Sequence, residues 1–210
     1  MPDSQGLKPY QTILTAGESE IVISKSRFLG YCLPVSSESA AQEALAQIRK
    51  KHFDARHCCY AFRLTGGIAR SSDDGEPSGT AGAPILSVLA GANVENVICA
   101  VVRYFGGVLL GTGGLVRAYG KAASEALEHA EIVQIRDCAR LSVSVSYSAY
   151  QLIEPMIRQK GYPNEAEFTD TVTLTLLLPA EESDALLSAI TDKTDGSARI
   201  EPLGQSLQEY

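Results

Sequence analysis

The residues of this sequence best suited to chemistry lie in a glycine-rich segment, residues 105–115, that joins a predicted strand to a predicted helix. Glycines at such a junction let backbone N–H groups close around an anion at the positive end of the helix. The two common nucleotide-binding patterns are nevertheless incomplete here. Gly106 and Gly111 have P-loop spacing, but Thr112 stands in place of the lysine, and Val116 replaces the last glycine of the dinucleotide pattern. The segment therefore does not predict a nucleoside triphosphatase.

An anion-binding nest of another kind fits the same junction. Thr112 begins the predicted helix and Arg117 falls in or near its first turn, where the helix dipole disfavours a cation unless an anion shares the site. Arg103 and Lys121 could contact the same anion. In the alternative interpretation the glycines serve close packing, and Lys121 pairs with Glu125 on a solvated helix face. The candidate anion-binding residues are Arg56, His57, Arg103, Gly106, Gly107, Gly111, Thr112, Gly113, Gly114, Arg117 and Lys121.

A second glycine-rich segment, residues 71–84, must be a loop, because it holds three glycines and two prolines. Its three carboxylates could bind Mg²⁺ through their oxygens, although acids beside glycine and serine are also typical of turns. We expect no other cofactor and no dedicated metal site. The candidate residues of this signature loop are Asp73, Asp74, Gly75, Glu76, Pro77, Ser78, Gly79 and Thr80.

Nucleophilic side chains near these segments do not form a hydrolase pattern. Ser78 is one position away from the GxSxG elbow, and a histidine directly before Cys58 in a strand points to the opposite face. We therefore expect His57 to serve as a hydrogen-bonding or anion-facing partner, together with Arg56. The sequence therefore assigns no catalytic residue.

Composition and charge narrow the class of protein. The 210 residues are 45% hydrophobic and 20% charged, as in globular proteins of one or two domains. No apolar run approaches the roughly 20 residues that span a bilayer, and the five cysteines form no CxxC pair, so we expect a cytoplasmic protein with reduced thiols and no membrane partner. The net charge of −7 arises beyond residue 136: residues 1–136 hold 13 basic and 13 acidic side chains, and residues 137–210 hold 5 and 12. A polyanion would have to bind the first part.

Hydrophobic periodicity predicts an α+β protein of two domains, residues 1–136 and 137–210. The second has the order β-α-β-β-α-β of a ferredoxin-like unit, with a loose tail from Leu203. In the first domain, strands are predicted at residues 20–24, 27–35, 58–64 and 97–105, and helices at 37–52, 84–92 and 112–130. In the second, strands are predicted at residues 139–147, 162–169, 171–178 and 197–202, and helices at 148–160 and 180–193.

Five strings taken together resemble the IMPACT/YigZ family in its two-domain bacterial form. They are KSRF at 25–28, DARH at 54–57, DDGEPSGTAG at 73–82, RYFGG at 103–107 and GTGGLVRAYG at 111–120. The resemblance covers essentially the whole chain. It implies an N-terminal domain with the fold of the second domain of a small-subunit ribosomal protein, also found in the translocation elongation factor. It implies, in addition, a ferredoxin-like C-terminal domain similar to the last domain of that factor.

The same resemblance implies a function. We expect a non-catalytic regulatory protein linked to translation or RNA metabolism, which binds the phosphates of an RNA or ribosome-associated partner at its glycine-rich face. Eukaryotic relatives regulate a translation kinase through an additional N-terminal domain, so that role is not carried over to this sequence. Two alternatives stay open: an enzyme acting on a small phosphorylated or nucleotide-like ligand, and a protein-interaction module that binds through its acidic second domain.

Overall fold

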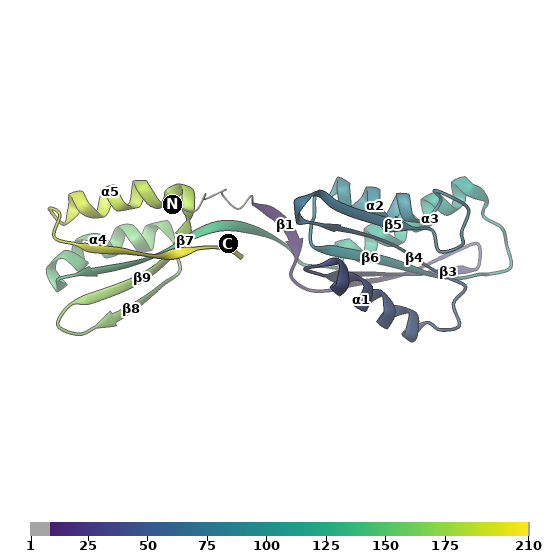
Figure 1. Ribbon diagram of the computed structural model, residues 1–210, viewed down its shortest axis with the longest axis horizontal. Helices are drawn as coiled ribbons and strands as arrows, with labels where there is room; N and C mark the ends of the chain where they lie inside the picture. Colours follow the sequence, from purple (N-terminus) through teal and green to yellow (C-terminus); the bar gives the residue numbers. More distant parts are fainter. Residues whose placement is uncertain (1–8, 210) are drawn as a thin grey trace. The chain divides into compact units, whose positions relative to one another are not determined.

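The computed structural model describes residues 9–209 and divides the chain into two compact units (Figure 1). Residues 10–134 form the first unit, and residues 135–209 with Pro9 form the second. The break lies two residues before the boundary that the sequence suggests. None of the helices within residues 9–209 is long and apolar enough to cross a membrane.

The first unit is built on a five-stranded antiparallel sheet of strand order β2-β3-β6-β4-β5. Its central strand is the continuous apolar run identified in the sequence, and it is buried on both faces, as such a run predicts. A 3₁₀ turn, Thr65–Gly67, connects two of the strands. The strands are β2 (Gly17–Ile23), β3 (Ser26–Pro34), β4 (His57–Leu64), β5 (Ile68–Ser72) and β6 (Val97–Tyr104).

Three helices cover this sheet, α1 on one face and α2 and α3 on the other (Figure 1). α1 (Glu38–Lys51) begins where the Ser37 hydroxyl accepts the N–H of Ala40 at 3.1 Å, an ordinary N-cap. α2 (Gly82–Gly91) and α3 (Gly111–Glu128) pack their alanine and leucine side chains on the opposite face. The sheet is therefore buried between two helical layers.

Small residues set the distance between α3 and the sheet. A Cβ on Gly30 of β3 would lie 2.6 Å from the backbone oxygen of Ala122, and one on Gly17 would lie 2.0 Å from that of Ala126. The Ser19 hydroxyl donates to the same Ala122 oxygen at 2.8 Å. α3 thus lies against the backbone of β2 and β3, which fixes the position of its N-terminus.

The second unit has the ferredoxin-like arrangement that the sequence predicts, with strand order β8-β9-β7-β10 and all pairs antiparallel. Its core lies between the sheet and the two helices. β7 begins in the first unit, at Ile132, and β1 (Tyr10–Ile13) pairs with it. The elements are β7 (Ile132–Val145), α4 (Tyr147–Lys160), β8 (Asn164–Phe168), β9 (Val172–Pro179), the 3₁₀ turn Ala180–Glu182, α5 (Ser183–Lys193) and β10 (Arg199–Glu209).

The structure departs from the sequence prediction at three segments. β1 and β5 were not predicted, because they are short and β5 is almost wholly exposed, so it carries no apolar pattern. The tail from Leu203 is not loose. A register shift between Pro202 and Gly204 lets β10 continue along the early half of β7, so that Gln205 pairs with Ala139.

Two glycine substitutions test the close approach of α3. Gly30→Ala should destabilise the first unit by about 1–3 kcal/mol, since the added methyl group meets the α3 backbone. Gly120→Ala, within α3 itself, meets nothing within 4 Å and should be neutral or stabilise by up to about 1 kcal/mol. Native-state hydrogen exchange of the β6 amides measures both effects. Equal effects of the two substitutions would contradict the packing described.

Candidate binding pocket at the glycine-rich segments

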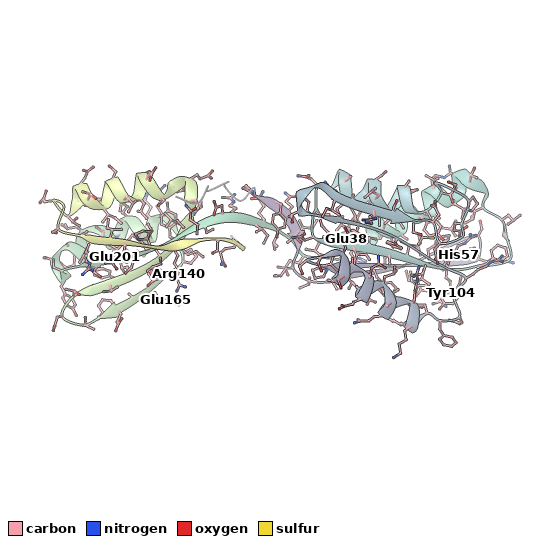
Figure 2. The ribbon with its side chains drawn as sticks, viewed as in Figure 1. Glu38, His57, Tyr104, Arg140, Glu165 and Glu201 are labelled. Carbon is pink, nitrogen blue, oxygen red and sulfur yellow. The ribbon has the colours of Figure 1, made fainter. Side chains whose placement is uncertain are left out.

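Both glycine-rich segments contribute to one pocket of about 430 Å³ in the first unit. Its walls come from the start of β4, the signature loop, the end of β6 and the start of α3. In Figure 2, His57 at the start of β4 and Tyr104 at the end of β6 are labelled at the same end of this sheet. The pocket contains the sequence-predicted residues Arg56, His57, Glu76, Pro77, Arg103, Gly111 and Thr112, together with Phe105, Leu109, Leu110 and Leu115.

A buried ion pair lies in the pocket lining. Arg103 Nη1 donates to Glu76 Oε1 at 2.6 Å, and their side chains are only 7% and 4% exposed. The Tyr119 hydroxyl of α3 donates to the same carboxylate oxygen at 2.8 Å. The Arg103 guanidinium also lies over two aromatic rings, 5.4 Å from the centroid of Phe28 and 5.5 Å from that of Phe105. Arg103 is therefore a buried partner of the signature loop rather than a surface cation.

Asp73 fixes the signature loop to α2. The N-cap residue of α2, Ala81, makes no side-chain cap, and Asp73 takes its place by accepting the N–H groups of Ala81 and Gly82 at 2.9 and 2.8 Å and that of Gly79 at 2.8 Å. Burial alone would raise the pKa of the Asp73 carboxyl, but the three backbone donors outweigh it and lower that pKa. Asp73 is thus a helix cap supplied from outside the helix.

Asp74 fixes the other end of the loop to β4 and α1. Its carboxylate accepts the backbone N–H of Cys58 at 2.8 Å and pairs with Arg49 at 3.0 Å. Its backbone oxygen lies 2.8 Å from His57 Nδ1. The acidic side chains of the loop thus point to separate protein donors rather than to a common centre, and within residues 9–209 no three His, Cys, Asp or Glu side chains gather in a way that could hold a metal ion.

The thiols near the pocket are protonated at neutral pH. Burial raises the pKa of Cys58 to about 11 and that of Cys59 to about 12. Cys59 Sγ also donates to the backbone oxygen of Asp73 at 3.0 Å. Burial raises the pKa of Tyr119 as well. None of these groups is a ready nucleophile, since the thiolate and not the thiol attacks.

Two exposed arginines, Arg56 in the lining and Arg117 at the first turn of α3, form what we call the rim of the pocket. Lys121 pairs with Glu125 at 3.6 Å, as the alternative interpretation of the sequence expects. Among residues 9–209, no ion pair engages Arg56 or Arg117, which are both exposed. A Cβ on Gly113 would lie 3.7 Å from Arg117 Nη1, so this guanidinium lies at the first turn of α3. No side chain caps that turn. The other predicted site residues outside the lining are Asp73, Asp74, Gly75, Ser78, Gly79, Thr80, Gly106, Gly107 and Gly114.

The apolar wall of the pocket was missed from the sequence. Leu109 is 87% exposed, and Phe105 and Val108 are nearly half exposed. Exposed apolar residues such as Val108 and Leu109 are unfavourable unless a ligand or partner covers them, whereas Leu110, the next residue of this apolar run, is half-buried against the core. That run within a glycine-rich segment is the signal that could have predicted the wall.

Known proteins share this architecture. Residues 24–127 match the model of the Impact N-terminal domain, and residues 143–197 match a domain of unknown function (DUF1949). The chain is 39% identical to the IMPACT family member YvyE of Bacillus subtilis, over 92% of this chain and 91% of that protein. This chain belongs to the IMPACT family. The family member YigZ of Escherichia coli is 35% identical, over 86% of this chain and 90% of that protein.

A solved structure and a mammalian protein are also similar to this chain. A crystal structure described as a hypothetical protein superposes with a TM-score of 0.61 at 30% identity, over 94% of this chain and 98% of that one. Protein IMPACT of Rattus norvegicus is 32% identical over 52% of this chain but only 35% of its own length. The family and the two-domain α+β fold expected from the sequence are confirmed.

Replacing the buried carboxylate should strongly lower the stability of the first unit. Glu76→Gln leaves Arg103 buried without its counterion, and we expect a loss of about 3–5 kcal/mol in the free energy of unfolding. Glu125→Gln removes the same charge from a partly exposed pair and should cost less than about 1 kcal/mol. Hydrogen exchange of the β6 amides measures the destabilisation that each substitution causes. A small effect of Glu76→Gln would show that the pair is not a structural constraint.

The buried thiols should make stability fall at alkaline pH. Cys58 and Cys59 have folded-state pKa values raised above the ordinary value of 9.0, so their contribution is complete below pH 9 and is lost as the pH rises towards 11 and 12. The loss is at most about 1.4 kcal/mol per thiol and pH unit. Urea unfolding at pH 8 and at pH 10 measures the loss as a difference in the free energy of unfolding. Cys59→Ala should make that difference smaller. An unchanged difference in that variant would contradict the assignment.

Proposed function

We propose that this member of the IMPACT family is a non-catalytic binding protein linked to translation or RNA metabolism, which holds a phosphate-bearing partner at the pocket of the first unit. The observation that carries the proposal is the uncapped first turn of α3, with Arg117 beside it and Arg56 in the pocket lining. Backbone N–H groups at a helix start and unpaired guanidinium groups are the donors that phosphate oxygens prefer.

The charge distribution of the chain also favours the first unit as the part that binds phosphates. Residues 137–210 hold 12 acidic and 5 basic side chains, so they repel a polyanion, whereas the first part is balanced. Arg103 does not contribute a free charge, because Glu76 neutralises it. The phosphate contacts therefore belong to Arg56, Arg117 and the first turn of α3, with His57 beside them in the pocket lining.

The side chains in and around the pocket favour binding over catalysis. The nearby thiols of Cys58 and Cys59 are protonated at neutral pH, and Asp73 and Asp74, which also lie outside the lining, are held by protein donors. The lining offers hydrogen-bond donors and apolar contacts, while the nearby thiols and carboxylates are not free to act as nucleophile or base.

Salt-dependent RNA binding tests this proposal. The intact chain should bind a short single-stranded RNA with an affinity that falls as KCl is added. Arg56→Gln and Arg117→Gln should each weaken binding and reduce the slope of log K against log salt by about 0.7, the value for one phosphate contact on a single strand. Fluorescence anisotropy at several KCl concentrations gives both quantities.

The matched control is Arg158→Gln, which removes one exposed positive charge from α4 of the second unit. It should leave the slope unchanged. Absence of RNA binding at low salt would overturn the proposal. So would a double variant, Arg56→Gln with Arg117→Gln, that keeps the slope of the unmodified chain.

A further inference from the structure

We propose that the pocket interior binds the base of a guanine nucleotide, with guanine O6 and N7 accepting hydrogen bonds from the free edge of Arg103. This rests on the proposed function, because the rim of the same pocket is the phosphate site. It adds a base preference that neither the family nor the phosphate site implies.

The inference starts from an unsatisfied donor. Arg103 is 94% buried, and its Nε has no hydrogen-bond partner among the described residues, whereas Nη1 is bound to Glu76. Buried side-chain donors are nearly always paired, because an unpaired one loses its water and gains nothing in return. Arg103 lines the pocket, so an acceptor on a bound ligand can supply what is missing once the protein atoms that cover Nε move aside.

The free edge of this guanidinium selects a pair of acceptors. A guanidinium is planar, and its Nε–H and one Nη2–H point in parallel from one side. Since Glu76 occupies Nη1, that side is the one left for a ligand. Two adjacent acceptors fit it, as in a carboxylate, a phosphate or the O6 and N7 atoms of guanine.

Charge decides among these acceptors. The Glu76 carboxylate lies 2.6 Å from Arg103 Nη1 and lines the same pocket, so the pair is already neutral. An anion on the remaining edge would add a second negative charge beside Glu76 in a largely apolar lining, which is unfavourable. A neutral pair of acceptors brings no such cost. Guanine provides it at O6 and N7 and cytosine at O2 and N3, and of these two bases the larger guanine covers more of the apolar lining, whereas adenine presents a donor, N6, next to its N7 acceptor.

The shape of the pocket fits a flat ring. Phe105 is 49% exposed and its ring lies over the Arg103 guanidinium, so a base in the plane of that guanidinium extends along the same ring. Leu109 and Leu110 form apolar walls, and Thr112 stands at the start of α3, where the phosphate would lie. The volume of about 430 Å³ is within the usual range for small-ligand sites. Stacking of bases on aromatic side chains is a general mode of single-strand recognition.

Base analogues test the inference without changing the protein. The intact chain is titrated with an oligouridine that carries one central guanine, hypoxanthine, 7-deazaguanine, adenine or cytosine. The cytosine RNA should bind more weakly than the guanine RNA, because its single ring covers less of the apolar lining. Hypoxanthine keeps O6 and N7, 7-deazaguanine lacks N7, and adenine reverses one of the two groups. We expect guanine and hypoxanthine to bind about 5- to 150-fold more tightly than adenine, with 7-deazaguanine weakened towards adenine. Competition by guanosine monophosphate, but not by adenosine monophosphate, would place a free nucleotide in the same site.

Phe105→Ala should reduce the preference for guanine, while the matched control Phe53→Ala should retain it, since Phe53 is 86% exposed and does not line the pocket. Salt-dependent binding of all five RNAs with equal affinity would overturn the guanine inference and leave the proposed function intact. Binding of none of the RNAs or nucleotides would overturn both.

Discussion

The buried ion pair between Arg103 and Glu76 is the interaction on which the candidate site depends. It joins the central strand of the first sheet to the signature loop, and the Tyr119 hydroxyl joins α3 to the same carboxylate oxygen. A buried charge is tolerated only when its counterion is in place, so the pair requires the loop to fold inward over the sheet. Asp73 and Asp74 then hold the two sides of that inward turn. The loop is thereby fixed to the scaffold at three points.

Because the loop is fixed in this way, the pocket has an interior and a rim that favour different chemical groups. Inside the pocket, the neutral pair and the apolar side chains favour a flat, uncharged group with acceptor atoms. At its rim, the uncapped start of α3 and the unpaired Arg56 and Arg117 favour negative charge. A nucleotide has both parts in one molecule. The close packing of α3 on Gly17 and Gly30 is what places the helix start beside the pocket.

The sequence predicted most of the fold because its signals are local. A continuous apolar run indicated β6, helical stripes indicated α1 and α3, and a glycine at position 161 marked the end of α4. Five strings taken together, with the signature loop among them, suggested the family. β5 could not be found in this way, because its exposed side chains carry no pattern, and the extension of β10 depends on pairing with β7.

The organisation of the site was harder to predict, because its contacts are long-range. Asp73, Asp74 and Glu76 look alike in the sequence, yet Asp73 caps a helix, Asp74 holds β4 and Glu76 enters the core. Their partners lie up to 43 residues away, so no local pattern distinguishes them. A lone arginine in a strand buried on both faces does require a counterion, and that requirement was the available clue that Arg103 is paired rather than free.

The most direct test of this account observes Arg103 itself. In the ¹⁵N-labelled intact chain, the Nε–Hε resonance of Arg103 reports on whether that donor gains an acceptor. The account predicts that guanosine monophosphate shifts this resonance as it binds and that adenosine monophosphate at the same concentration does not. A resonance that stays in place while other signals of the pocket shift with guanosine monophosphate, or that shifts equally with both nucleotides, would contradict it.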